Sequence, residues 1–295
     1  MTTVLPAARE LQRPAGVLRY IDHGVGPAVV CVHGNPTWSY YYRALVPALS
    51  DHHRVVVPDH LGMGRSDTPP ASRYGYDLAA RVDDLAALMD TLAIGVDRPA
   101  TLVVHDWGGA IALAWATRNP DRVGRLVLCN TAAFPRLDGE PLPWLLRPAR
   151  VPMLGALLVQ GANAFARGTL RIGVRRRQLS RAVRRAYLAP YRSWHDRTGV
   201  LAFVRDVPDD PSGPTHALLA ETAANLHLLA DRPALVLWGM RDPMLTPAYL
   251  TEWRRRLPGA EIHAIADAGH LVLEDAPETV PLVVEFLART AGTVG

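Results

Sequence analysis

The chain has 295 residues, of which 49% are hydrophobic and 20% are charged, and its formal net charge is +4 at pH 7. This apolar mass is sufficient to bury a large core, which excludes a disordered chain and a fibrous protein. No apolar stretch reaches the about 20 residues that span a membrane, and no secretory signal is visible at the start, so we expect a cytoplasmic protein.

Short β-branched segments predict the strands of a mostly parallel sheet. In chain order these segments are 28–32, 54–57, 101–104, 125–128, 234–237 and 261–265. Helical periodicity occurs at 40–49, 76–92, 110–118, 247–257 and 278–289. Because the strand segments are apolar without alternation, they suit a sheet that is covered by helices on both faces. The sequence therefore predicts an α/β fold with a doubly wound sheet, to which residues 18–21 add an antiparallel edge strand.

The segment between residues 129 and 234 breaks this alternation. It spans roughly a hundred residues, which is too many for a connecting loop, and its apolar residues recur at helical spacing. Prolines cluster near both of its ends. We therefore expect an α/β core domain formed by residues 1–134 and 229–295, with an inserted helical cap domain at residues 135–228.

The predicted cap is strongly basic, and every basic residue of the chain is an arginine. Residues 136–205 contain 14 arginines and three acidic residues, a net charge of +11, whereas the rest of the chain carries −7. The arginine-rich stretch 167–192 lacks the interleaved aromatic residues of a nucleic-acid interface, so we expect no nucleic-acid partner. A surface of this sign suits an acidic partner protein or an anionic membrane surface.

Residues 101–110 predict a strand that runs into a tight glycine turn and then a helix. Such a nucleophile elbow presents one side chain at the carboxyl edge of the sheet, beside a helix N-terminus, and here that side chain is Asp106. A carboxylate at this position can attack carbon without first losing a proton and form an ester. The alternative is that Asp106 only caps the helix, as aspartate commonly does.

Two later segments favour the catalytic interpretation. His270 follows the last predicted strand, which is the usual chain position of the base in nucleophile-elbow hydrolases. Asp242 follows the strand before it, where its carboxylate could hold the His270 ring in one tautomer. A lone loop histidine is more often a surface residue, but three suitable residue types at three strand ends indicate a site.

Asn35 follows the first parallel strand, where the oxyanion loop of these hydrolases lies. Its side-chain NH₂ and the indole N–H of Trp107 could bind an anion that leaves the reacting carbon. The backbone N–H groups of the same two residues could form an oxyanion hole during ester hydrolysis. The alternatives are a turn at Asn35 and core packing at Trp107.

No other pattern points to a bound group. His52 and His53 lack cysteine or carboxylate neighbours at ligand spacing, and no glycine-rich dinucleotide fingerprint follows the first parallel strand. We therefore expect neither a metal nor a cofactor.

Three motifs resemble the haloalkane dehalogenase family of α/β-hydrolases. They are His-Gly-Asn-Pro-Thr-Trp-Ser-Tyr at 33–40, Pro-Asp-His-Leu-Gly-Met-Gly-Arg-Ser-Asp at 58–67 and His-Asp-Trp-Gly-Gly at 105–109. The resemblance covers nearly the whole chain, and it implies an α/β-hydrolase fold with a helical cap.

Carried onto this sequence, the family pattern implies Asp106 as nucleophile, His270 as base and Asp242 as the acid of the triad. It also implies that Asn35 and Trp107 form the anion-binding pair. Some members carry the acid as a glutamate after the strand that here ends near Cys129. Asn130 stands at that point and cannot do this work, so the resemblance leaves the role to Asp242.

The cap is similar to that of a narrower group, the β-lactone decarboxylases of bacterial olefin biosynthesis. The similarity lies in Pro-Trp-Leu-Leu at 143–146 and in segments 154–167 and 186–194. It implies conversion of a β-lactone with apolar chains to a cis-alkene and carbon dioxide, with haloalkane dehalogenation as the alternative. We expect the cap to line a substrate tunnel with apolar side chains: Leu154, Leu157, Leu158 and Phe165.

Two other functions are weaker alternatives. An epoxide hydrolase also uses an aspartate nucleophile, and Tyr187 and Tyr191 could serve as its acid pair, but such enzymes usually carry phenylalanine where Asn35 stands. A non-catalytic receptor on this fold often lacks a triad member, whereas this chain keeps all three.

Overall fold

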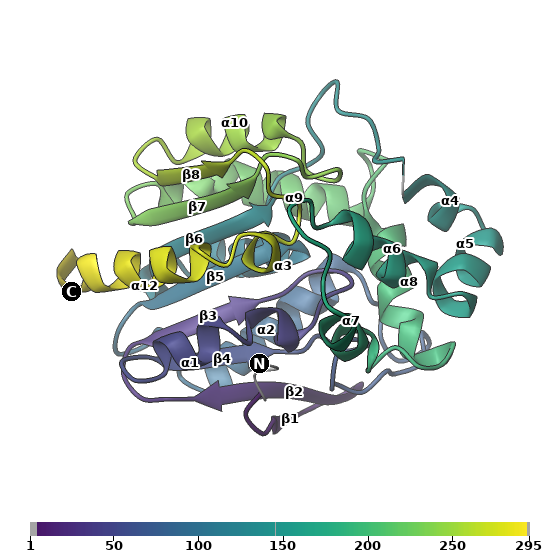
Figure 1. Cartoon of the computed structure of the whole chain (residues 1–295). Helices are drawn as coiled ribbons and strands as arrows, with labels where there is room; N and C mark the ends of the chain where they lie inside the picture. The colour runs from purple at the N-terminus through teal and green to yellow at the C-terminus, as the bar shows by residue number, and fades with distance from the viewer. Residues whose placement is uncertain (1–4, 145, 294–295) are drawn as a thin grey trace.

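The computed structural model describes residues 5–144 and 146–293, and its centre is an eight-stranded sheet (Figure 1). The strand order is β1-β2-β4-β3-β5-β6-β7-β8, in which β3 to β8 are parallel and β1 and β2 are antiparallel to their neighbours. The bounds are β1 Arg9–Arg13, β2 Gly16–His23, β3 Ala28–Val32, β4 Arg54–Pro58, β5 Ala100–Asp106, β6 Val123–Thr131, β7 Ala234–Gly239 and β8 Glu261–Ile265. The predicted doubly wound α/β sheet is confirmed.

Helices cover both faces of this sheet. α1 (Leu45–Leu49) and α12 (Thr279–Arg289) pack together in front of the strands (Figure 1). α3 (Trp107–Arg118) and α9 (Pro214–Asn225) lie behind the strands, and α2 (Leu78–Thr91) packs against both α3 and α9. α10 (Pro247–Arg256) precedes β8, and the short α11 (Val272–Asp275) follows the β8 loop. The inner strands are consequently buried on both faces, which explains their continuous apolar runs.

Two predicted elements differ from the structure. The segment 18–21 lies within β2 and pairs antiparallel with β4, but the edge of the sheet is β1, which the sequence did not reveal. The β1 sequence Arg-Glu-Leu-Gln-Arg is polar because both of its faces are largely open to solvent. The predicted helix 40–49 is divided into a 3₁₀ turn, Ser39–Tyr42, and α1. Pro47 lacks an N–H and is tolerated only in a first helical turn, so α1 begins just before it.

A group of short helices lies beyond the carboxyl ends of the parallel strands (Figure 1). It comprises α4 Leu146–Arg150, α5 Leu154–Ala156, the π-helix η3 Leu157–Gly161, α6 Ala164–Ile172, α7 Arg181–Leu188 and α8 Thr198–Asp206. The division into core and cap stays a proposal. Because α9 packs against α2 and α3, we propose that the cap ends before α9 rather than at residue 228.

Within the two described ranges, no helix has the length and apolarity needed to cross a bilayer. Nor do those ranges place three or more His, Cys, Asp or Glu side chains together so that they could hold a metal ion. Cys31 and Cys129 are free thiols buried in β3 and β6, where they pack as small hydrophobic side chains.

Candidate active site

Asp106 stands at a sharp turn between β5 and α3. Its backbone has φ 52° and ψ −127°, which is unusual for a residue with a side chain. The turn depends on glycine, because a Cβ on Gly108 would lie 1.9 Å from the carbonyl oxygen of Val32. The Asp106 side chain makes no capping hydrogen bond to α3. The capping alternative is therefore wrong, and the carboxylate faces the space above the sheet.

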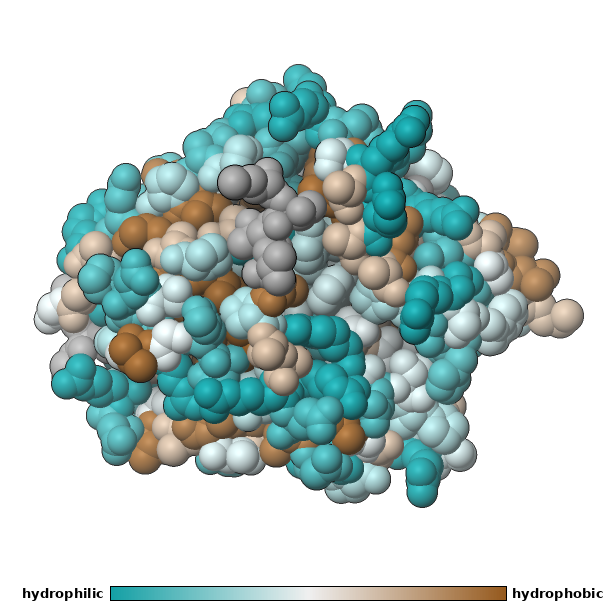
Figure 2. Space-filling view, turned by 60° about the horizontal axis from the view of Figure 1, so that its bottom comes forward, coloured by the Kyte–Doolittle hydropathy of each residue, from teal (hydrophilic) through white to brown (hydrophobic). Residues whose placement is uncertain are grey.

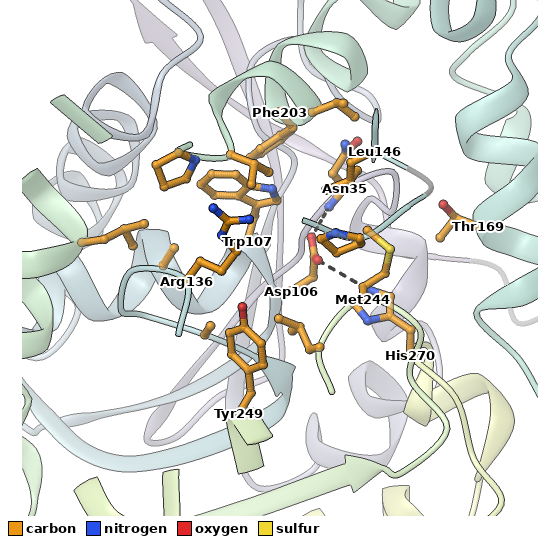
Figure 3. A pocket seen from close by; sticks show the side chains of 18 of the residues that line it. Asn35, Asp106, Trp107, Arg136, Leu146, Thr169, Phe203, Met244, Tyr249 and His270 are labelled. Carbon is orange, nitrogen blue, oxygen red and sulfur yellow. Dashed lines mark hydrogen bonds and ion pairs between the residues drawn. The ribbon is translucent and has the colours of Figure 1, made fainter. Parts of the chain in front are cut away.

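Two groups hold the Asp106 carboxylate in place (Figure 3). Its Oδ1 accepts a hydrogen bond from the backbone N–H of Asn35 at 2.8 Å, and its Oδ2 lies 3.4 Å from Nε2 of His270. Burial alone would raise the pKa of Asp106. The hydrogen bond from His270, the positive charge of His270 and the hydrogen bond from the Asn35 N–H outweigh this effect and lower the pKa below its ordinary value. The carboxylate is therefore ionised at neutral pH.

His270 joins Asp106 to Asp242. The ring is 2% exposed, and its Nδ1 lies 2.7 Å from Oδ2 of Asp242. Burial favours the neutral ring, but the carboxylates of Asp242 and Asp106 outweigh this effect and raise the pKa of His270 to about 10. In the resting site His270 is consequently an imidazolium between two carboxylates.

Asp242 lies in the loop after β7 and is held by three donors besides His270. Its Oδ1 accepts the backbone N–H groups of Met244 at 2.7 Å and Leu245 at 3.1 Å, and its Oδ2 accepts Nδ2 of Asn130 at 2.9 Å. Asn130 also accepts the N–H of Gly239 at 2.8 Å. Asn130 cannot act as an acid, but its amide ties the end of β6 to Asp242, a positioning role that the sequence did not reveal.

Asn35 and Trp107 both line the cavity above Asp106 (Figure 3). Nδ2 of Asn35 donates to the carbonyl of Val200 in α8 at 3.1 Å. Since an amide NH₂ has two hydrogens, one remains for a ligand. The indole of Trp107 packs against Phe203, with ring centroids 5.4 Å apart. The structure thus brings together all five residues that the sequence singled out.

The cavity that contains Asp106 is mostly apolar, and we call it the first cavity. It extends from the reactive groups toward Phe134, Leu219 and Tyr249, with Arg136 as an additional charged group in its wall. The tunnel prediction is partly wrong. Leu154 and Leu157 are 44% and 59% exposed on the outside of the cap, because the helical spacing does not say which side of a short helix faces inward.

The loop that carries His270 is fastened to the segment 173–176, and the sequence did not reveal this contact. Asp275 is 5% exposed and accepts the backbone N–H groups of Gly269 and Arg175, each at 2.7 Å, and of Arg176 at 2.9 Å. On the other side of His270, the N–H of Leu271 donates to the carbonyl of Gly173 at 2.8 Å. Both neighbours of His270 are therefore anchored through this segment.

The two candidate tyrosines of an epoxide hydrolase point elsewhere. The hydroxyl of Tyr187 donates to Glu274, and that of Tyr191 donates to the carbonyl of Thr37 at 3.3 Å. Among the described residues, neither tyrosine belongs to the wall of the first cavity. The geometry therefore disfavours the epoxide hydrolase alternative.

Known proteins resemble this chain along almost its full length. Residues 27–277 match the alpha/beta hydrolase fold family. A protein of Shewanella oneidensis named cis-3-alkyl-4-alkyloxetan-2-one decarboxylase is 45% identical over 292 residues, which cover 98% of this chain and 91% of that protein. A protein of the same name from Xanthomonas campestris is also 45% identical, with 94% of each chain covered.

Haloalkane dehalogenases are more distant. Haloalkane dehalogenase 2 of Mycobacterium bovis is 31% identical over 271 residues, which cover 91% of this chain and 90% of that protein. The crystal structure of the haloalkane dehalogenase DatA from Agrobacterium tumefaciens is 30% identical and superposes with a TM-score of 0.85, with 96% of each chain covered. The chain, with these decarboxylases and dehalogenases as its relatives, belongs to the alpha/beta hydrolase fold family.

Proposed function

We propose that this protein is an enzyme that decarboxylates a β-lactone with apolar chains to a cis-alkene and carbon dioxide. Asp106 is the nucleophile, His270 and Asp242 complete the triad, and Asn35 and Trp107 bind the developing anion. The observation that carries the proposal is an ionised carboxylate at the elbow, facing an apolar cavity. The 45% identity to proteins named oxetanone decarboxylases favours this substrate over a haloalkane.

The reaction can be written with the residues present. A carboxylate oxygen of Asp106 attacks the β-carbon of the lactone, and the ring C–O bond breaks to leave a free carboxylate on the neighbouring carbon. The bond to this carboxylate then breaks, its electrons form the C=C bond, carbon dioxide leaves, and the bond to Asp106 returns its electrons to the aspartate. No water or proton is consumed. Attack at the carbonyl is the other way to open the ring, and it places alkoxide charge near the same donors.

Haloalkane dehalogenation is the second candidate, because the same triad and the same anion-binding pair suit that reaction. In its first step a carboxylate oxygen of Asp106 attacks the carbon that carries the halogen, the carbon–halogen bond breaks and halide leaves. The resulting ester at Asp106 removes the negative charge beside His270. Loss of that charge lowers the pKa of His270, so the neutral ring can then accept a proton from water. The two reactions therefore differ after the ester forms, and the triad alone does not separate them.

One assay distinguishes the two functions. Purified protein is incubated separately with a cis-disubstituted β-lactone and with a panel of bromoalkanes, and the release of alkene and bromide is measured. We expect alkene from the lactone. Bromide release with a kcat in the ordinary range of about 1 to 1000 per second, without alkene from lactones of several chain lengths, would replace this proposal with a dehalogenase.

A further part of the proposal concerns the basic cap surface of a cytoplasmic enzyme. Five arginines line one groove between α6 and α7, namely Arg167, Arg171, Arg181, Arg184 and Arg185. In the described part of the chain, none of the five forms an ion pair with a carboxylate. This groove suits an anionic membrane surface or an acidic partner protein, because its charge is not neutralised internally.

Exposed apolar side chains favour the membrane surface. They occupy the outer end of the cap at Val151, Met153, Leu154, Leu157 and Trp194. Figure 2 shows this apolar tip at the right edge of the molecule, with hydrophilic side chains beside it.

We expect the protein to sediment with anionic vesicles but not with neutral ones. The double substitution Arg184→Glu and Arg185→Glu should weaken that binding. Arg254→Glu on α10 is the control. If the protein does not sediment with anionic vesicles, the acidic partner protein replaces the membrane surface in this proposal.

A further inference from the structure

A second cavity lies beside the first, inside the cap. It is enclosed by α4, η3 and α6 and by the loop after β7, through residues that include Leu158, Val159, Ile172 and Pro243. Four residues belong to the walls of both cavities, namely Phe165, Thr169, Met244 and His270. The two cavities therefore adjoin at His270. Figure 3 shows Thr169 beyond Met244 and His270 as seen from Trp107.

The walls of the second cavity are suited to hydrocarbon. Apart from Thr169 and His270, the described residues that line it are apolar or glycine, and none carries a formal charge at neutral pH except His270 at the junction. The first cavity extends from Asp106 in another direction, toward Phe134 and Leu219. Since His270 Nε2 lies 3.4 Å from Oδ2 of Asp106, the nucleophile is next to the point where the cavities adjoin.

We propose that the two cavities bind two separate alkyl chains of one substrate, with the reacting ring held between them beside Asp106. This inference rests on the proposed function. A cis-3,4-dialkyl β-lactone carries its chains on two adjacent ring carbons, so both chains start at the reacting centre and need two apolar spaces that meet there. A simple terminal haloalkane has one chain and needs only one such space.

Gly168 determines how much chain the second cavity accepts. On α6 it lies three residues after Phe165 and four before Ile172, so all three residues face the same side of the helix. A Cβ placed on Gly168 meets no atom within 4 Å. A Cβ therefore fits at this position without displacing a neighbour, and leucine also favours the helix more than glycine does.

The test uses Gly168→Leu for the second cavity and Ala132→Leu for the first, whose wall includes Ala132. Ala162→Leu adds similar bulk on the exposed side of the cap and is the control. Each protein is assayed with four cis-lactones: dimethyl, long at C3 only, long at C4 only, and long at both. Melting temperatures and the dimethyl lactone report whether each variant folds, and Gly168→Ala provides a milder version of the first change.

We expect Gly168→Leu to lower kcat/KM at least tenfold for two substrates: the lactone that is long only at one of the two ring carbons, and the lactone that is long at both. The lactone that is long only at the other ring carbon should be unaffected. Ala132→Leu should show the opposite preference, and the exposed control Ala162→Leu should leave all four rates unchanged. If both variants penalise the same ring position, or if Gly168→Leu leaves all four rates unchanged, the two-chain assignment is wrong. If the wild-type protein makes no alkene from any of the four, the proposed function fails and this inference fails with it.

Discussion

Asp106 combines an unfavourable backbone conformation with an ionised side chain. A φ of 52° costs the chain free energy, and the tight strand-to-helix turn that imposes it also aims the carboxylate into the first cavity. His270 and the N–H of Asn35 keep that carboxylate ionised although it is buried. The residue is therefore ready to attack carbon without a preceding proton transfer.

Asp106→Ala should abolish alkene formation, with a loss of at least about a thousandfold in kcat, because no other nucleophile is presented by the elbow. The fold should persist, since alanine removes only the side chain beyond Cβ. Alkene release measured by gas chromatography, with a thermal melt beside it, tests this expectation. Substantial activity in a preparation free of wild-type protein would falsify the nucleophile assignment.

The Trp107→Phe variant keeps an aromatic ring against Phe203 but removes the indole donor. If this N–H binds the developing anion, the variant should bind a bromide ion more weakly by about 1 to 3 kcal/mol, the cost of leaving a buried polar group without its hydrogen bond. Inhibition of alkene formation by bromide provides the measurement. Trp144→Phe, on the exposed part of the cap, is the control. An unchanged inhibition constant in Trp107→Phe would contradict the anion-binding role.

These residues could be read from the sequence because each follows a recognisable strand. Asp106 is the last residue of β5, and Asn35, Asp242 and His270 follow β3, β7 and β8. The carboxyl ends of parallel strands meet at one edge of a sheet. The role of Asn130 could not be read in the same way. An asparagine carries no sign of which carboxylate it will hold, and the contact with Asp242 joins positions 112 residues apart.

The segment that follows α6 covers the site and also holds the loop that carries His270. The Asp275 carboxylate accepts backbone N–H groups from segment 173–176 and from Gly269. One carboxylate therefore links the His270 loop to the cap. Sequence patterns did not reveal this arrangement, because the donors are main-chain groups that every sequence carries. The pattern after His270 showed only two adjacent acidic residues, Glu274 and Asp275, without their partners.

Asp275→Ala should destabilise the protein by about 1 to 3 kcal/mol, because it removes the acceptor of the buried N–H of Gly269 and of two partly buried N–H groups. It should also lower kcat/KM by roughly ten- to a hundredfold through a misplaced His270. Asp275→Asn keeps one acceptor oxygen and should recover part of the activity. Urea melts and steady-state kinetics measure the two effects. Asp267→Ala, which removes an exposed partner of Arg176, is the control, and equal behaviour of the two alanine variants would refute the positioning role.

The site is formed by segments that are distant in the chain, so the protonation of its residues is coupled to folding. The imidazolium of His270 exists at neutral pH only because the fold places Asp106 and Asp242 beside it. The neighbouring His105 stays neutral, since burial, with the charge of His270, lowers its pKa to about 3. Unfolding separates these groups and returns the His270 ring to water.

The free energy of unfolding should consequently fall as the pH rises from about 6.5, the ordinary pKa of histidine, toward the folded pKa of about 10. In that window the folded protein still holds a proton on His270 that the unfolded chain has released, so each increase in pH favours unfolding. Below that window both states carry the proton, and the stabilising contribution of His270 is fully present and constant. His270→Gln lacks this titration but keeps the other groups, such as Asp206, whose carboxyl pKa burial raises to about 6. Urea unfolding of both proteins between pH 6 and 10 therefore isolates His270 as a difference. The stability advantage of the wild-type protein should shrink steadily with pH, whereas parallel curves would show that His270 is not protonated in the folded protein.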